Sequence, residues 1–179
     1  MLFWMTFSTL LWAAPAPVAV APGAPALVFE LPAANPRAAT ALVQRDSVAL
    51  TALTGAMPTH AHKAVVVHFF RTQDGDGAMA ALERIRRRFH DKGVAVLAIS
   101  VDQPDFSALS SWAATRSIRF PVLHDAHRIV SSRYGVKTFP LTMVIDGDGR
   151  LFAVGQPTPE EFEQELGAEL EGLLAQSSD

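Results

Sequence analysis

Continuous apolar runs alternate with amphipathic segments along most of the chain. Residues 64–70 (AVVVHFF) and 94–101 (VAVLAISV) are apolar runs rich in β-branched side chains, which suit strands buried on both faces of a sheet. Between them, apolar residues recur at spacings of three and four and predict a helix that ends near Gly93. The buried stripe of this helix consists of Met79, Leu82, Ile85 and Phe89.

The second half of the chain repeats this alternation. We expect helices over residues 105–116 and 126–134, with a short strand over 120–123 between them. Two more strands, 141–145 and 151–154, are joined by a hairpin turn of sequence DGDG. A last helix has a proline in its first turn and an apolar stripe, formed by Pro159, Phe162, Leu166, Leu170 and Leu173. The alternation predicts an α/β fold, a central mixed sheet with helices on both faces.

A less regular N-terminal extension, residues 27–63, precedes this domain. It contains two short apolar stretches, 27–29 and 47–50, which we expect to pair as an edge hairpin, and a turn-like stretch over 54–62. The regular domain itself is expected to span residues 64–175.

The first 26 residues resemble an export signal. Residues 2–14 are almost entirely apolar, but they are too few to span a bilayer, which needs about 20 residues. Small residues and prolines follow, and we expect cleavage after Ala26. Because no Lys or Arg precedes Arg37, an uncleaved membrane anchor, or neither role, stays as an alternative. Cleavage would give a periplasmic or otherwise extracytoplasmic protein without a stable membrane span.

Charge and cysteine content exclude several functions. The net charge of −3 and the pI of about 6.0 argue against a nucleic-acid partner, which would favour a basic face. The chain contains no cysteine, so it can form no disulfide, thiolate nucleophile or metal–thiolate centre. Phosphate-binding loops and dinucleotide fingerprints are absent as well, and we expect no cofactor.

Four sequence strings resemble the thioredoxin superfamily, and within it the exported thiol-disulfide oxidoreductases of the TlpA/ResA type, which overlap the AhpC/TSA redoxins. The strings are VVVHFFRT, ALERIRRRFHDKGVAVLAISVD, FPVLHD and YGVKTFPLTMVIDGDGRL. The resemblance implies a thioredoxin-like fold. It also implies a Cys-x-x-Cys motif at a helix N-terminus after the first string and a cis-proline in the last string.

The chain departs from this family pattern at its chemical centre. In place of Cys-x-x-Cys it has Asp74-Gly75-Asp76-Gly77, so Asp74 and Gly77 take the two cysteine positions. Thiol-disulfide exchange and peroxide reduction both need a thiolate, and we therefore expect neither activity. We interpret the aspartates as helix-capping residues. A weak cation site formed by Asp74 and Asp76, or an altered chemistry that uses them, is the alternative.

The resemblance places Pro140 at the position of the family's cis-proline. In the family, the residue before this proline, here Phe139, presents its backbone to an extended substrate chain. We therefore expect a peptide-binding groove at Phe139 and Pro140 that does not depend on catalysis. The alternative is that the proline only shapes the start of the following strand.

The histidines give weaker signals. His60 with His62 and His124 with His127 have spacings that would allow copper or zinc binding, although neither pair has further ligands nearby in the sequence. His68 falls inside a buried strand and is expected to be a hydrogen-bonded interior residue.

These observations lead to one hypothesis and its rivals. The hypothesis is a redox-inactive thioredoxin-like protein that acts as a binding or interaction module in the cell envelope, with an extended peptide or an envelope protein as its partner. The rivals are an enzyme of altered chemistry, a weak metal-binding protein, and a copy without a retained biochemical role.

Overall fold

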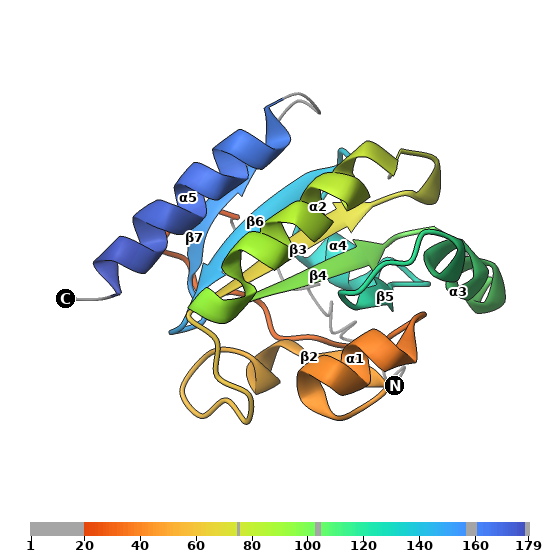
Figure 1. The fold of residues 1–179 in the computed structure, drawn as a ribbon, viewed down its shortest axis with the longest axis horizontal. Coiled ribbons are helices and arrows are strands. Elements are labelled where there is room, and N and C mark those ends of the chain that lie inside the picture. The colour runs from red at the N-terminus through yellow and green to blue at the C-terminus, as the bar shows by residue number, and fades with distance from the viewer. Residues whose placement is uncertain (1–19, 75, 103–104, 157–160, 178–179) are drawn as a thin grey trace, which may run out of the picture.

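Five strands form one mixed sheet in the order β5-β4-β3-β6-β7 (Figure 1). The computed structural model describes residues 20–74, 76–102, 105–156 and 161–177. Strands β3, β4 and β5 run parallel, β6 runs antiparallel to β3, and β7 runs antiparallel to β6. Their bounds are Ala64–Phe70 (β3), Val94–Ser100 (β4), Val122–His124 (β5), Leu141–Asp146 (β6) and Leu151–Gly155 (β7). The predicted α/β class with a mixed central sheet is confirmed.

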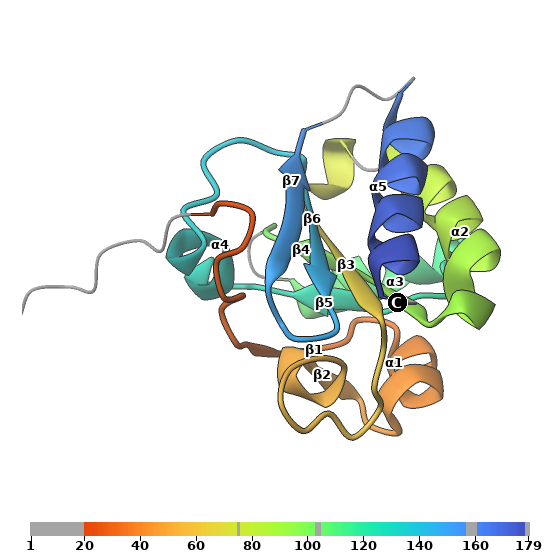
Figure 2. The same cartoon turned by 90° about the vertical axis from the view of Figure 1, so that its left-hand side faces the viewer.

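Helices cover both faces of the sheet (Figure 2). Helices α2, α3 and α5 share one hydrophobic core with one face, and α4 packs on the other face together with the N-terminal extension. The bounds of these helices are Asp76–Phe89 (α2), Phe106–Thr115 (α3), Ile129–Arg133 (α4) and Phe162–Gln176 (α5). Every residue of β3 and β4 is buried, as the continuous apolar runs predicted. The predicted start of the last helix at Pro159 lies outside the described residues.

Helices α2 and α5 lie side by side because each has an apolar stripe turned to the sheet. The stripe residues Ile85 of α2 and Leu170 of α5 are fully buried in the same core. Ion pairs join the outer faces of the two helices: Arg84 to Glu163 at 2.5 Å and Arg88 to Glu171 at 2.6 Å. Because these side chains are about half exposed, we assign the packing energy mainly to the apolar stripes.

The N-terminal extension differs from the prediction in two ways. Its first strand, β1 (Glu30–Pro32), lies three residues later than expected and pairs antiparallel with β2 (Ser47–Ala49). A helix that we did not predict, α1 (Pro36–Val43), lies between them. The Asn35 side chain fixes its start by accepting from the Val122 amide at 2.8 Å and donating to the Phe120 carbonyl at 2.9 Å. The bonded residues are more than 80 positions apart in the sequence, so no local sequence pattern predicts this contact.

Two elements near β5 are also shorter than expected. The strand covers residues 122–124 rather than 120–123, and α4 begins at Ile129 rather than at residue 126. Arg128 has a left-handed backbone (φ 52°), which interrupts any helix there. The buried Asp125 carboxylate accepts from the amides of Val130 and Ser131 and so satisfies the first turn of α4 instead.

Residues 20–26 follow the outer edge of β7. The Gly23 amide donates to the Leu151 carbonyl at 2.6 Å, the Leu151 amide donates to the Ala24 carbonyl at 2.9 Å, and the Ala26 amide donates to the Gly149 carbonyl at 2.8 Å. The apolar stretch over residues 2–14 lies outside the described residues. In the part of the chain that is described, no helix has both the length and the apolar character needed to cross a membrane.

Candidate functional site: a cysteine-free loop beside Phe139 and Pro140

The Asp74–Gly77 segment lies between the C-terminal end of β3 and the start of α2. A short 3-10 helix, Thr72–Asp74, leads into it, and α2 begins at Asp76. Gly77 is exposed, and a Cβ atom added there would meet no atom within 4 Å. Gly75 and the Asp76 carboxylate lie outside what the structure describes. The segment therefore occupies the expected place at the N-terminus of α2.

Arg71 holds the Asp74 carboxylate. Its Nη2 and Nε atoms donate to Asp74 Oδ2 at 2.7 and 2.8 Å. We expected Asp74 to cap α2, but no backbone amide of the described residues donates to this carboxylate. The loop thus keeps its anion next to a cation from the same turn, where the family's motif would have a cysteine.

The same arginine reaches Phe139. The Arg71 guanidinium carbon lies 5.9 Å from the centre of the Phe139 ring, within the range of a cation–π contact. Arg71 therefore connects Asp74 to the segment that contains Pro140, although these residues are far apart in the sequence. The structure brings the two predicted parts of the site together at one end of the sheet.

A residue that we did not predict, Asp102, fixes the start of the loop. The Thr72 amide donates to Asp102 Oδ2 at 2.6 Å, and the Ser100 hydroxyl donates to the same oxygen at 3.2 Å. Asp102 follows the end of β4, whose C-terminus lies beside that of β3 because the two strands are parallel. The sequence signal that could have identified Asp102 was its position, as an acidic residue directly after a predicted buried strand.

The Phe139–Pro140 bond is cis, and both residues are half-buried just before β6. Neither the amide nor the carbonyl of Phe139 has a hydrogen-bond partner among the described residues. The preceding residue is held in place, because Gln156 Nε2 donates to Thr138 Oγ1 at 2.5 Å and to the Thr138 carbonyl at 3.2 Å. The segment thus offers a fixed backbone with free hydrogen-bonding groups.

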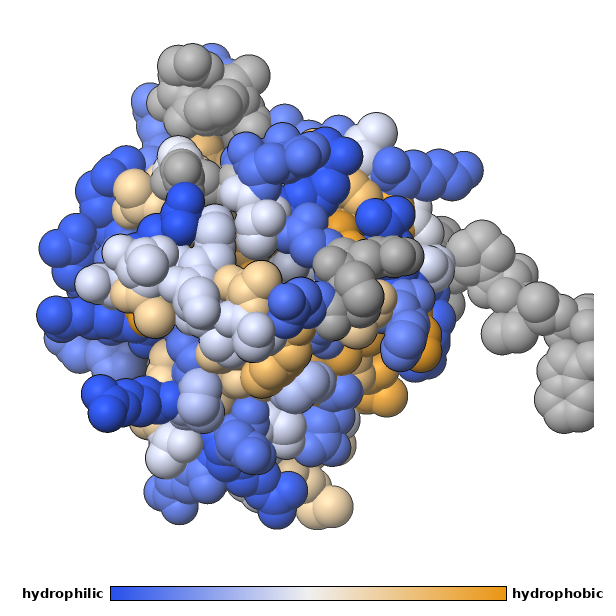
Figure 3. Space-filling model, turned by 90° about the vertical axis from the view of Figure 1, so that its right-hand side faces the viewer, coloured by the Kyte–Doolittle hydropathy of each residue, from blue (hydrophilic) through white to orange (hydrophobic). Residues whose placement is uncertain are grey.

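A groove of about 420 Å³ adjoins this segment. It lies between the connection from α4 to β6 and the end of β7, and its lining includes Tyr134, Val136, Thr138, Leu141, Val154 and Gln156. Figure 3 shows the end of the molecule at which β3 and β4 terminate, where apolar surface is exposed among polar side chains. The groove beside Phe139 and Pro140 therefore combines apolar and polar side chains, as a surface that binds a polypeptide needs to do.

His68 lies in β3 beneath this end of the sheet and is fully buried. Its Nδ1 atom is 2.9 Å from Thr142 Oγ1, while Nε2 has no partner among the described residues. The ring packs against Phe70 and, edge to face, against Phe162. Burial lowers the pKa of His68 to about 3, so the side chain is neutral near neutral pH. The expectation of a fully bonded interior histidine holds for only one of its two nitrogens.

The two histidine pairs do not assemble into a metal centre in the described part of the chain. His62 Nδ1 contacts the His60 carbonyl at 2.6 Å, and burial lowers the pKa of His62. His124 is buried against Phe106, whereas His127 is exposed. Among the described residues, no group of three or more His, Asp or Glu side chains lies together as metal ligands would.

Residues 22–154 match the sequence profile of the AhpC/TSA family. The chain belongs to the AhpC/TSA family. The match covers most of the chain, including β1 to β6 and the Asp74–Gly77 segment, so the family assignment rests on the same elements that build the site.

The relatives that match this chain are named as thiol-disulfide oxidoreductases. The chain is 27% identical to the thiol-disulfide oxidoreductase ResA of Bacillus anthracis over 105 residues, which make up 56% of this chain and 60% of that protein. The ResA of Geobacillus thermodenitrificans is likewise 27% identical over 108 residues, which are 58% of this chain and 62% of that protein. The chain thus matches about 60% of the length of these relatives.

Solved structures confirm the thioredoxin-like fold. Peroxidoxin BcpB from Mycobacterium tuberculosis superposes with a TM-score of 0.67 at 20% identity, covering 84% of this chain and 96% of that one. A thiol-disulfide oxidoreductase from Bacteroides fragilis gives a TM-score of 0.62 at 18% identity, covering 82% and 98%. This AhpC/TSA member shares their fold, but its 179 residues include no cysteine.

Proposed function

We propose that this AhpC/TSA family member binds an extended polypeptide segment at the groove beside Phe139 and Pro140 and performs no thiol chemistry. The observation that carries the proposal is the free backbone of Phe139 next to a loop that holds an Arg71–Asp74 ion pair instead of cysteines. An extended chain that lies along Phe139 would pair with its amide and carbonyl, as in β-strand addition.

The chemistry of the loop supports the proposed lack of thiol chemistry. A disulfide exchange needs a thiolate that attacks sulfur, and neither a carboxylate nor a glycine can replace it. Asp74 is also engaged by Arg71, which leaves it a poor ligand for a metal ion. The rival function as a metal-dependent or otherwise altered enzyme therefore has less support than binding.

The surface around Phe139 supports the proposed binding of a polypeptide. Thr138 is anchored by Gln156, so the Phe139 backbone is ordered before a partner arrives and loses little conformational entropy on binding. The adjoining groove of about 420 Å³ has room for side chains of the bound segment. Backbone pairing would supply affinity, and this groove would supply a preference among side chains.

We further propose that the protein works outside the cytoplasm. The apolar segment over residues 2–14, followed by small residues and prolines, supports export, and so do the names of the ResA relatives, which describe thiol-disulfide chemistry. Its partner would then be an envelope protein with an accessible extended segment. Expression of the full chain with a periplasmic reporter would test this part, and a reporter retained in the cytoplasm would contradict it.

A binding experiment tests the central proposal. Linear peptides selected on the purified protein from a displayed library are resynthesised with N-methyl groups on alternate amides, in both registers. Strand pairing uses the amides of alternate residues only, so one register should abolish binding and the other should leave it nearly unchanged. Equal loss in both registers, or chemical-shift changes remote from Phe139, would refute pairing at this backbone.

A parallel assay separates the binding proposal from catalysis. Insulin reduction by the same preparation, with dithiothreitol as the electron source, should not exceed the rate without protein. Turnover above that rate would overturn the claim of redox inactivity, whatever the peptide result.

A further inference from the structure

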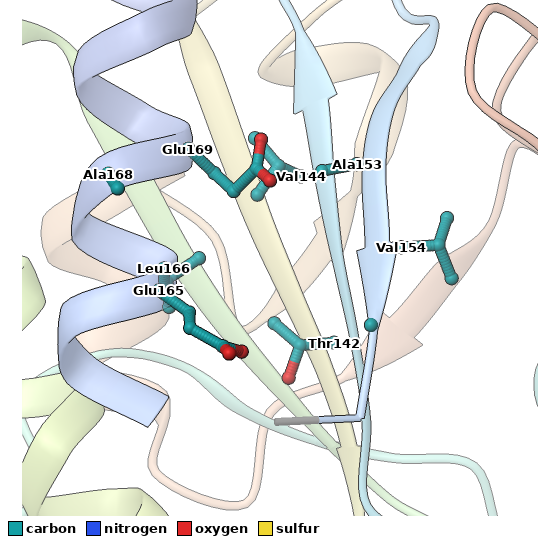
Figure 4. Close-up of a pocket in the computed structure, with 9 residues that line it drawn as sticks. Thr142, Val144, Ala153, Val154, Glu165, Leu166, Ala168 and Glu169 are labelled. Atoms are coloured by element: carbon teal, nitrogen blue, oxygen red, sulfur yellow. The ribbon is translucent and has the colours of Figure 1, made fainter. Parts of the chain in front are cut away.

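A second groove lies between α5 and the β6–β7 hairpin (Figure 4). Its volume is about 430 Å³, which falls within the usual range of small-molecule pockets, about 300–1,000 Å³. It is lined by Thr142 and Val144 of β6, Ala153, Val154 and Gly155 of β7, and Glu165, Leu166, Ala168 and Glu169 of α5. Two of these residues, Val154 and Gly155, also line the groove beside Phe139, because β7 lies between the two grooves.

The groove lies between α5 and the C-terminal part of β7, where the packing between the helix and the strand is open. The helix packs on α2, β3 and β6, and its buried residues Phe162 and Leu170 belong to the core shared with those elements. At the outer strand the facing residues are small, namely Ala153 and Gly155. Space for a ligand therefore remains between the helix and the sheet edge.

The interior of the groove is apolar. Val144 and Leu166 are buried at its base, and Ala153 is half-buried beside them. Thr142 contributes a hydroxyl, but this group already lies 2.9 Å from His68 Nδ1 and so has a partner inside the protein. The interior is thus suited to the hydrocarbon part of a ligand.

The rim of the groove is negative. Glu165 and Glu169 are four residues apart on α5 and therefore lie on one face of the helix, and Figure 4 shows both side chains directed from the helix toward the strands. Neither carboxylate forms an ion pair within the described residues. The other two acidic residues of this helix do, because the arginines of α2 neutralise them in the pairs Glu163–Arg84 and Glu171–Arg88.

We propose that this groove binds a small monoamine, in which an ammonium group is joined to a compact apolar body. The ammonium group would lie between the exposed Glu165 and Glu169 carboxylates and form charge-assisted hydrogen bonds with them. The apolar body would lie against Val144, Ala153 and Leu166. Charge complementarity at the rim, combined with an apolar base, selects amines over neutral and anionic molecules of the same shape.

The test uses 2-phenylethylamine as the probe and the full chain as the receptor. Backbone amide chemical shifts are followed during titration, with 2-phenylethanol and 3-phenylpropanoate as the neutral and anionic controls. The amine should shift the amides of Thr142, Ala153, Gly155 and Glu165 in a saturable way. The two controls should bind at least about tenfold more weakly.

Matched variants locate the site. The double substitution Glu165→Gln with Glu169→Gln should weaken amine binding by about tenfold or more, because both carboxylates are lost. The control Glu163→Gln with Glu171→Gln removes the same charge from the same helix but leaves the groove intact, and it should retain affinity within about twofold. Ala153→Ile, a strand-compatible change, should fill the base and also abolish binding.

The outcomes are distinguishable. Equal binding of 2-phenylethylamine and 2-phenylethanol would overturn the role of the carboxylates. Equal loss in the two double variants would show a diffuse effect of charge rather than a site, and saturable shifts confined to other residues would place the amine elsewhere. An absence of saturable shifts would overturn the proposal directly, and none of these results bears on peptide binding at Phe139.

Discussion

The guanidinium of Arg71 lies over the ring of Phe139 while it also binds the carboxylate of Asp74. Two segments that are remote in sequence are thereby joined across the end of the sheet. In this AhpC/TSA member a cation, an anion and an aromatic ring lie together at this end of the sheet. The relatives that match the chain are named thiol-disulfide oxidoreductases.

The Arg71–Asp74 pair should contribute little to stability. The two side chains are 40% and 32% exposed, so water screens their attraction. In a double-mutant cycle with Arg71→Gln and Asp74→Asn, followed by urea unfolding, we expect a coupling free energy below about 1 kcal/mol. It should fall further in high salt. A coupling of several kcal/mol that is insensitive to salt would contradict a solvent-exposed pair.

Two cysteines should return thiol chemistry to the loop. We predict that Asp74→Cys combined with Gly77→Cys gives insulin reduction above the wild-type rate, because Gly77 has free space for a side chain and the positive end of the α2 dipole favours a thiolate. The single variants Asp74→Cys and Gly77→Cys are the controls, since neither can close an intramolecular disulfide. A double variant no faster than the single ones would contradict this prediction and would point to a loop geometry that keeps the two thiols apart.

His68 should make the protein sensitive to acid. Its pKa is about 3 in the folded state, well below the unfolded value of about 6.5, so the unfolded chain binds the extra proton between these values. The contribution of neutral His68 to stability is complete above about pH 6.5 and is lost as the pH falls toward 3, by up to about 1.4 kcal/mol per pH unit.

Urea unfolding at several pH values checks this. The slope of the unfolding free energy with pH should be smaller in His68→Leu than in the wild type over that acid range. His90→Gln, which removes an exposed histidine, should keep the wild-type slope. If His68→Leu and the wild type lose stability in parallel, His68 does not carry the effect.

Asn35 should be a stabilising contact between the extension and the sheet. Asn35→Ala leaves the Val122 amide and the Phe120 carbonyl without their partner, which we expect to cost about 1–3 kcal/mol in the free energy of unfolding. Asn35→Asp retains an acceptor for Val122 but turns a carboxylate toward the carbonyl, and it should cost at least as much. Chemical denaturation measures both variants, and a loss below about 0.5 kcal/mol would class Asn35 with ordinary surface positions.

The sequence predicted the sheet well and the extension poorly, for a physical reason. Strands β3 and β4 are buried on both faces, so their apolar runs are continuous and readable. Helix α1 has no side-chain cap at its own N-terminus, because Asn35 bonds instead to β5. Likewise, the left-handed Arg128 shortens α4 without a glycine that would signal it.

The two segments of the site could be predicted from the sequence, but the contacts that join them could not. The resemblance located Asp74, Gly77 and Pro140, whereas the contacts of Arg71 with both Asp74 and Phe139 depend on the packing of distant segments. The groove between α5 and the β6–β7 hairpin, rimmed by Glu165 and Glu169, was not predicted from the sequence. Its charge becomes visible only when Glu163 and Glu171 are found paired with arginines of another helix.

The hydrogen bonds between residues 23–26 and Gly149–Leu151 join the segment before Leu27 to the folded domain. Removal of the chain up to Ala26 would take these bonds away and free the amide and carbonyl of Leu151, the first residue of the outermost strand β7, and the carbonyl of Gly149. An exposed strand edge of this kind can pair with a strand of another chain. A chain that keeps residues 23–26 therefore covers this end of β7, whereas a chain that begins after Ala26 would expose it to pairing with another strand.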